Sequence, residues 1–248
     1  MDSIYFWPLA IAASVFVGMG KGGLPVIAML AVPALALVMS PVAAAGMLLP
    51  VYVVSDMFGL IAYRRDFDRT VLTIMICGMT VGVGIGWALA HIVPEPVVTL
   101  VVGLIGAIFA LNLILREKPD TPARKPRWGS GMFWGTITGF TSFVSHSGGP
   151  PYQVWVLPLK LSKAAFVGTS VIAFSYVNAI KLVPYYFLGQ LNLENLKIAA
   201  LLMAPAAASV WIGVWLVRIL PEKLFFEIVT WALLILSLKL IWDGATGL

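Results

Sequence analysis

The stretch Ser145-His146-Ser147-Gly148-Gly149-Pro150-Pro151 interrupts a long apolar run in the second half of the chain. A partial echo, Gly20-Lys21-Gly22-Gly23-Leu24-Pro25, interrupts an apolar run in the first half. We call these stretches the second break and the first break. Each contains a Gly-Gly pair followed by proline, a combination that predicts the end of one helix and the start of another.

The composition indicates a membrane protein. Hydrophobic residues make up 60% of the 248 positions and charged residues 11%, whereas a soluble domain carries about 25% charged residues. Five separate stretches of roughly 20 or more apolar residues are too many for one soluble core, and each could cross a bilayer as a helix. We therefore predict an all-α, multi-pass integral membrane protein of the cell (inner) membrane.

The residue inventory argues against several functions. The formal net charge of +5 comes mainly from basic residues in short loops between apolar runs, which is typical of cytoplasmic loops and not of a nucleic-acid-binding surface. One cysteine, Cys77, and two histidines predict no metal site and no redox pair, and no cofactor is expected. The sequence contains no phosphate-binding glycine loop, no zinc-protease motif and no nucleophile elbow, so we assign no catalytic residues.

The second half of the chain repeats landmarks of the first half in the same order. Gly22-Gly23 matches Gly148-Gly149 at a separation of 126 residues, Asp56 matches Asn178 at 122, and a Pro-Glu pair recurs at 127. Paired halves that each contain a Gly/Pro-broken apolar segment are typical of transporters whose site lies at the interface of the repeats.

The predicted organisation is a first membrane repeat at 1–115, a charged cytoplasmic linker at 116–128 and a second membrane repeat at 129–248. If each broken segment is a re-entrant hairpin, each repeat has three full crossings and the two repeats are inverted. The cytoplasmic loops then hold 12 of the 16 Lys and Arg residues, as the positive-inside rule favours. This arrangement places both termini outside.

The two breaks are predicted to meet near the bilayer midplane and to bind an anion. A helix that restarts after a Gly-Gly pair presents free N–H groups and the positive end of its dipole, and glycine lets the backbone approach a ligand. The residues expected to contact the substrate are Lys21, Gly22, Gly23, Ser145, His146, Ser147, Gly148, Gly149 and Gln153. The alternative is a packing kink, because glycine and proline are frequent in membrane helices.

The charged and polar side chains at the breaks have competing interpretations. Lys21 lies about 17 residues from either end of its apolar region, which favours a buried role over an extension of its side chain to the membrane surface. His146 is either a ligand or proton-relay group or a side chain satisfied by a neighbouring carbonyl.

Asp56 is a carboxylate well inside an apolar helix. Such a residue suggests proton coupling, but it could also be structural and neutralised by a lysine. Its counterpart Asn178 can form hydrogen bonds, and Lys181 lies one turn further along the same helix face. We list Asp56, Asn178 and Lys181 as candidates for coupling, with a proton as the expected coupling ion.

With these features the chain resembles the sulfite exporter TauE/SafE family of membrane proteins. The resemblance lies in the Gly-Lys-Gly-Gly-Leu-Pro stretch at 20–25, the Ser-x-Ser-Gly-Gly-Pro stretch at 145–150, and the duplicated halves with a charged linker between them. It implies export of small organosulfur anions such as sulfite, sulfoacetate or related sulfonates. It also implies that the glycine pairs of both breaks belong to the site, and it supplies no role for His146.

The predicted function is secondary transport of a small organosulfur anion by alternating access. An anion channel with the same helix-terminus site is the main alternative, and its flux could not be concentrative. A membrane enzyme that uses His146 and its neighbouring serines is the third. The glycine-rich stretch from Gly78 to Gly86 suits close helix packing within one chain or between two chains, which leaves a homodimer open.

Overall fold

The apolar runs form helices throughout the part of the chain that the structure describes. That structure is a computed structural model, and it describes residues 4–39, 41–90, 92–115, 122–191 and 193–247. Within these ranges the regular elements are all helices. Residues 116–121 of the predicted linker lie outside the described residues. The elements are α1 (Phe6–Lys21), α2 (Pro25–Ala28), α3 (Ala31–Ala36), α4 (Pro41–Tyr63), α5 (Arg69–Ala88), α6 (Glu95–Leu115), α7 (Trp128–Ser145), α8 (Gly149–Val156), the 3₁₀ helix η1 (Leu157–Leu159), α9 (Lys163–Phe187), α10 (Leu193–Ile219) and α11 (Glu222–Thr246).

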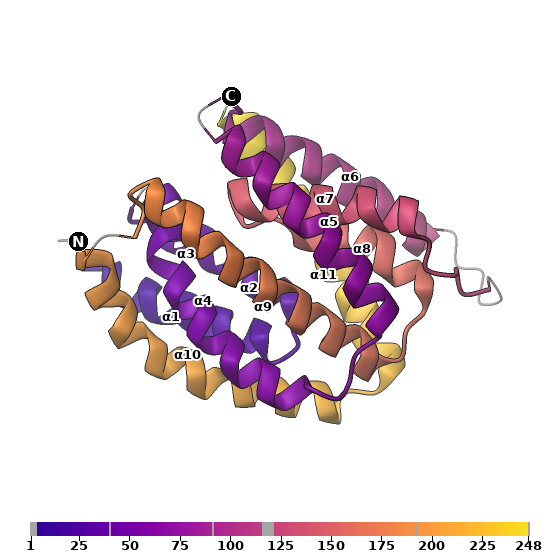
Figure 1. The fold of residues 1–248 in the computed structure, drawn as a ribbon. Coiled ribbons are helices and arrows are strands. Elements are labelled where there is room, and N and C mark those ends of the chain that lie inside the picture. The colour runs from indigo at the N-terminus through magenta and orange to yellow at the C-terminus, as the bar shows by residue number, and fades with distance from the viewer. Residues whose placement is uncertain (1–3, 40, 91, 116–121, 192, 248) are drawn as a thin grey trace. The chain divides into compact units, whose positions relative to one another are not determined.

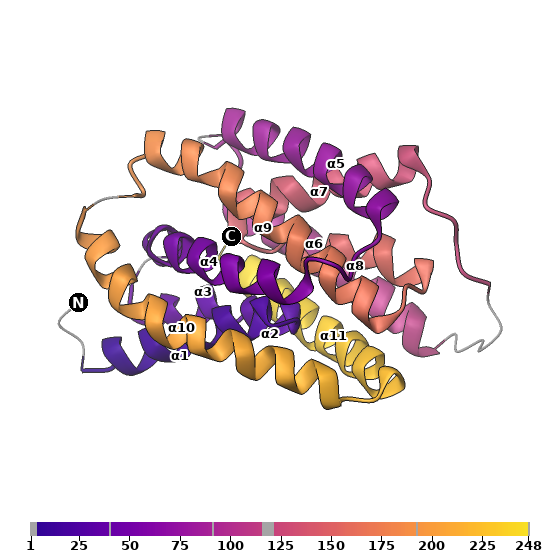
Figure 2. The ribbon, with the colours of Figure 1, turned by 60° about the horizontal axis from the view of Figure 1, so that its bottom comes forward.

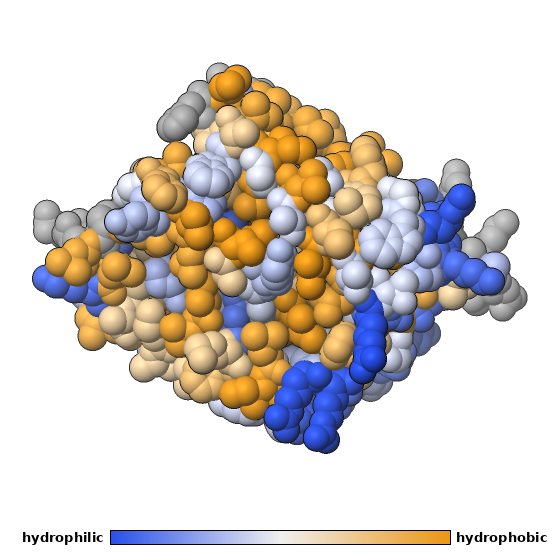
Figure 3. Space-filling view, viewed as in Figure 1, coloured by the Kyte–Doolittle hydropathy of each residue, from blue (hydrophilic) through white to orange (hydrophobic). Residues whose placement is uncertain are grey.

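Six helices of the described chain are long and apolar enough to span a membrane. They are α4, α5 and α6 in the first half and α9, α10 and α11 in the second. Many large apolar side chains on these helices are exposed, including Trp215, Trp231 and Trp242, and apolar residues cover much of the face seen in Figure 3. The prediction of an all-α membrane protein with three spans in each half is confirmed.

Both breaks make the chain fold back. α1 ends at Lys21, and α2 and α3 then pack against it. α7 ends at Ser145, and α8 packs back against α7. The broken segments are therefore helical hairpins. The inverted orientation of the two halves stays a prediction.

The helices form two compact units, and each unit draws on both halves of the sequence. Unit 1 consists of residues 1–67 and 167–220. Its apolar core lies among α1, α3, α4 and α10, whose close association is visible in Figure 1. The buried core residues are Phe6, Ala10, Ala13, Val17, Ala31, Val32, Leu35, Ala44, Met47, Leu48, Val51, Tyr52, Ile198, Ala199, Leu202 and Ala206.

Unit 2 consists of residues 68–166 and 221–248, and glycines bring its helices into close contact. α5 packs along α7, as Figure 2 shows, and a Cβ added at Gly78 would lie 2.8 Å from the Cα of Gly135. Gly82 and Gly86 also face α7, whereas Gly84 faces open space. The glycine-rich helix thus packs within one chain, as small residues allow in membrane helices.

The division into units differs from the division into predicted repeats. α1 packs against α10 in unit 1, and α7 packs against α5 in unit 2. In both cases the first helix of a broken segment packs on the second spanning helix of the other half. This correspondence is what a duplication would produce. The repeat boundaries at 1–115 and 129–248 themselves stay a prediction.

Candidate functional site

The first break uses its glycine pair to close the end of α1. The amides of Gly22, Gly23 and Leu24 donate to the carbonyls of Gly18, Gly20 and Met19 at 2.8, 3.1 and 3.3 Å. Gly23 has a φ of 110°, a backbone conformation that glycine adopts without a Cβ clash. Together these bonds satisfy carbonyls that the end of a helix otherwise leaves without partners.

These hydrogen bonds correct one expectation. We predicted free N–H groups at Gly22 and Gly23 for an anion, but both amides are used in capping α1. The following helix, α2, has only four residues and therefore provides no appreciable dipole. The amides of Gly22, Gly23 and Leu24 are therefore already bonded within the hairpin.

Lys21, the last residue of α1, forms a buried ion pair with Asp56 of α4. Its Nζ lies 2.7 Å from Oδ1 of Asp56, and the two residues are 5% and 3% exposed. Burial removes both charged groups from water, which is costly. The ion pair offsets this cost only when the other hydrogen-bonding positions of the ammonium and the carboxylate are also satisfied. The prediction that Lys21 is buried is confirmed.

Helix α9 completes the surroundings of the Asp56 carboxylate. The Nδ2 of Asn178 donates to Oδ2 at 2.9 Å. The hydroxyl of Ser175 lies 2.8 Å from Oδ1 of Asp56 and 2.7 Å from the carbonyl of Val171, so its single proton has two alternative acceptors. Both carboxylate oxygens therefore have partners.

Lys181 adds a second cation to this cluster. It lies one turn after Asn178 on α9, is 0% exposed, and interacts electrostatically with Lys21 and Asp56. Its Nζ also lies 5.9 Å from the centre of the Tyr185 ring. We call Lys21, Asp56, Ser175, Asn178 and Lys181 the buried charge cluster; all five belong to unit 1.

A stripe of residues on α4 holds the first break in place. Tyr52, Asp56, Gly59 and Tyr63 follow the spacing of one helix face. The Oη of Tyr63 donates to the carbonyl of Gly22, and that of Tyr52 to the carbonyl of Ala28, each at 2.7 Å. A Cβ added at Gly59 would lie 2.8 Å from the carbonyl oxygen of Lys21. The Lys21 ammonium also lies 5.2 Å from the centre of the Tyr52 ring.

The second break is built differently, because two residues separate the end of α7 from the glycine pair. His146 is the C-cap of α7 and takes the left-handed conformation, with φ 53°. The amide of the next residue, Ser147, donates to the carbonyl of Thr141 at 3.3 Å and closes the helix end. The hydroxyls of Ser145 and Ser147 donate to the carbonyls of Thr141 and Ser145. These serine donors serve the hairpin itself.

The glycine pair of the second break starts helix α8. Gly148 is its N-cap and Gly149 its first residue, and both are buried. Among the described residues we find no acceptor for either amide, and the next two positions are prolines, which have no N–H. Two buried backbone donors at the start of an eight-residue helix have the character of an anion-binding terminus.

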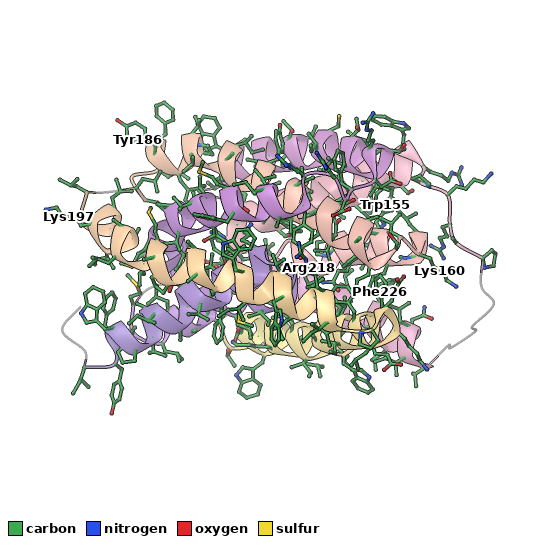
Figure 4. The ribbon with its side chains drawn as sticks, turned by 90° about the horizontal axis from the view of Figure 1, so that it is seen from below. Trp155, Lys160, Tyr186, Lys197, Arg218 and Phe226 are labelled. Carbon is green, nitrogen blue, oxygen red and sulfur yellow. The ribbon has the colours of Figure 1, made fainter. Side chains whose placement is uncertain are left out.

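Side chains of α8 anchor and extend this region. Trp155, labelled in Figure 4, donates from Nε1 to the hydroxyl of Ser130 on α7 at 3.1 Å. Gln153 is 1% exposed, and its Oε1 has no hydrogen-bond partner among the described residues. A buried acceptor without a donor is uncommon in proteins.

The predicted site residues thus fall into two groups. Lys21, Asp56, Asn178 and Lys181 come together in unit 1, whereas residues 145–149 and 153 belong to unit 2. The joint site formed by the two breaks stays a prediction. Sequence reasoning missed Ser175, although it precedes Asn178 by three residues on the same helix face.

Comparison with models of known protein families identifies a family for the chain. A family model described as "Sulfite exporter TauE/SafE" matches residues 9–240, nearly the whole chain. No curated protein and no solved structure matches.

Proposed function

The chain belongs to the sulfite exporter TauE/SafE family of membrane transporters, and we propose that it exports small organosulfur anions such as sulfite or sulfonates. The proposed mechanism is secondary transport by alternating access, in which helices move around a substrate site inside the membrane. The cell (inner) membrane is the proposed location.

The observation that carries this proposal is the buried charge cluster. The buried charged residues of the described chain are two lysines, Lys21 and Lys181, and one aspartate, Asp56. Ionisable side chains inside membrane helices are costly and usually mark a substrate or ion pathway. An excess of lysine over carboxylate favours a negatively charged substrate.

The backbone of the second break supports the same conclusion from unit 2. The buried amides of Gly148 and Gly149 offer hydrogen-bond donors where the dipole of α8 is positive. Sulfite and sulfonates present oxygen acceptors of the kind that such donors bind. Replacing Gly149 with leucine would place a side chain at this helix start, where the proposed anion contacts the amides.

Alternating access is supported by the burial of the cluster. Lys21, Asp56 and Lys181 have almost no exposed surface. A hydrated anion could reach them only after helices separate on one side, which is the movement that a transporter makes and a permanently open pore does not.

The test is flux in proteoliposomes that contain the purified protein. Sulfite or sulfoacetate trapped inside should drive uptake of labelled substrate against its gradient by exchange, which a channel cannot produce. Lys21→Ala and Gly149→Leu should abolish this exchange. Lys197→Met, which changes an exposed lysine of α10 (Figure 4), should leave it unchanged.

Three results would contradict the proposal. The first is the absence of flux with sulfite, sulfoacetate, taurine and a phosphonate, and the second is flux that only equilibrates. The third is chemical conversion of the sulfonate. Repeating the assay under an imposed pH gradient tests the expected proton coupling. A flux rate that is the same with and without the gradient would contradict that coupling.

A further inference from the structure

Two buried polar side chains of unit 2 have no hydrogen-bond partner in the part of the chain that the structure describes. They are Gln153 of α8, at its Oε1, and Ser237 of α11, at its Oγ. Gln153 is 1% exposed and Ser237 is 0% exposed. Buried polar atoms in proteins are nearly always paired, so each of these two atoms calls for a partner beyond the described chain.

Ser237 lies beside the start of α8. Helix α6 packs against both α8 and α11. At Gly106 of α6 an added Cβ would collide with Oγ of Ser237 and would lie 3.0 Å from Cβ of Pro150. Pro150 is the second residue of α8. The Ser237 hydroxyl and the first turn of α8 therefore face the same point on α6.

Gln153 is directed to the same helix start from within α8. It follows Gly149 by four positions and Pro150 by three, spacings that place side chains on one helix face. The Cα–Cβ bonds of an α-helix tilt toward its N-terminus, so the side chain of Gln153 extends back over Gly149 and Pro150. Its amide group thus approaches the region that Ser237 approaches from α11.

The helix start and the two side chains together offer both donors and an acceptor. The amides of Gly148 and Gly149 are buried and have no acceptor among the described residues. The hydroxyl of Ser237 can donate to an anion oxygen, whereas Oε1 of Gln153 can only accept. A ligand that satisfies all four groups must carry acceptor oxygens and at least one O–H or N–H donor. All four groups belong to unit 2.

We propose that the negative group of the substrate binds the amides of Gly148 and Gly149 and the hydroxyl of Ser237, and that Gln153 accepts a hydrogen bond from a hydroxyl or amino group of the same substrate. This proposal rests on the proposed function, because it names substrate contacts and a substrate class for the same transporter. The preferred class is an organosulfur anion that carries a hydrogen-bond donor, such as a hydroxyalkanesulfonate, an aminoalkanesulfonate or hydrogensulfite.

The first experiment compares binding of two sulfonates that have the same charge and differ by one hydroxyl group, 2-hydroxyethanesulfonate and ethanesulfonate. Purified wild-type protein should bind 2-hydroxyethanesulfonate about tenfold more tightly or better, because ethanesulfonate leaves Oε1 of Gln153 buried without a donor. Gln153→Met removes the acceptor from a side chain of similar length and should reduce this preference to within about twofold. Binding of ethanesulfonate by the variant should stay near that of the wild type.

Ser237→Ala tests the donor to the negative group. Because the hydroxyl has no partner in the described chain, its removal should leave the thermal unfolding temperature in detergent unchanged. Binding of both sulfonates should weaken by about tenfold, as expected when a hydrogen bond to a charged group is lost. The preference between the two probes should not change. A merely structural role for Ser237 would instead lower stability.

Two control variants make the same chemical changes elsewhere. Thr230→Val, also in α11, removes a hydroxyl that donates to the carbonyl of Phe226. Gln190→Met, in unit 1, removes another buried acceptor that has no partner among the described residues. Both variants should bind the two probes as the wild type does.

Three results would overturn the proposal. They are equal affinity of the wild type for the two probes, a preference that survives in Gln153→Met, and unchanged binding of both probes by Ser237→Ala. If both variants lose stability but bind as the wild type does, buried water satisfies these groups and the proposal is equally wrong. The wild-type comparison needs no variant, so it decides the question even if Gln153→Met does not fold.

Failure of the proposed function gives a different pattern. In that case wild-type protein transports no organosulfur anion in proteoliposomes and binds neither probe. Transport by the wild type that continues unchanged in Ser237→Ala and Gln153→Met contradicts only the inference about these two residues.

Discussion

The first and second breaks share a Gly-Gly pair and a following proline, yet they differ in what they offer a ligand. At the first break the amides of Gly22 and Gly23 are bonded to α1, and the chemistry lies in the side chain of Lys21. At the second break the serines and His146 serve the hairpin, and the amides of Gly148 and Gly149 start a new helix.

The difference follows from the position of the glycines relative to the preceding helix. Gly22 directly follows the last residue of α1, so the pair becomes the C-terminal cap. His146 and Ser147 separate α7 from Gly148, so His146 takes the left-handed cap position and the pair begins α8. A shift of two residues therefore changes a helix end into a helix start, with opposite electrostatic character.

The largest effect is expected from breaking the ion pair of the first break. Lys21→Met leaves the Asp56 carboxylate buried without its cation and should lower the free energy of unfolding by ~3 kcal/mol or more. Thermal unfolding in detergent measures this. Adding Asp56→Asn to Lys21→Met should recover most of the lost free energy of unfolding, because no unpaired carboxylate is then buried. A single variant as stable as wild type would show that the pair is not a structural requirement of this break.

Backbone conformation distinguishes the two glycine pairs next. Gly23→Ala should destabilise by about 2 kcal/mol, because φ is 110° and the new Cβ would lie 2.6 Å from Cγ1 of Val167. Gly148→Ala is the counterpart in the second break, where φ is −71° and causes no such strain. Equal losses in the two variants, measured by thermal unfolding, would contradict the distinction.

The tyrosine that holds the first break gives a smaller effect. Tyr63→Phe removes the buried hydrogen bond to the Gly22 carbonyl and should cost about 1–2 kcal/mol of unfolding free energy. Tyr186→Phe, at a residue 68% exposed on α9 (Figure 4), is the control and should change nothing measurable. Chemical denaturation of both variants in the same detergent provides the comparison. Equal stability of the two variants would show that the Tyr63 hydrogen bond does not stabilise the first break.

The smallest effect is expected at His146. Because its φ of 53° suits glycine better than other residues, His146→Gly should leave stability unchanged or raise it by up to about 1 kcal/mol, whereas His146→Ala should lower it. Transport by folded His146→Gly protein is the informative measurement. If flux is retained, His146 acts only as a helix cap. If flux is lost in the folded variant, the imidazole side chain takes part in transport.

Much of the fold could be predicted from local sequence. Long apolar runs between charged loops predicted the six spans, and the Gly-Gly-to-proline stretches predicted where α1 and α7 end. These features depend on the hydropathy and backbone preferences of neighbouring residues, and both can be read from the sequence. The burial of Lys21 also followed from its position deep in an apolar run.

The hydrogen-bond and ion-pair partners of the candidate site residues could not be predicted in the same way. Whether the Gly22 and Gly23 amides are free depends on the cap geometry of α1, and the same pattern of residues allows either outcome. The sequence suggested that Asp56 could pair with a lysine, but the choice of Lys21 as the direct partner depends on how α1, α4 and α9 pack.

By itself the sequence determined that this is a helical membrane protein with six spans, two broken segments and the residues of a TauE/SafE transporter. Tertiary structure alone decided that each compact unit combines helices from both halves, and that Ser175 joins Asp56 across 119 residues of chain. The reason is physical: hydropathy and glycine content act locally, whereas hydrogen bonds and ion pairs between helices depend on which distant faces pack together.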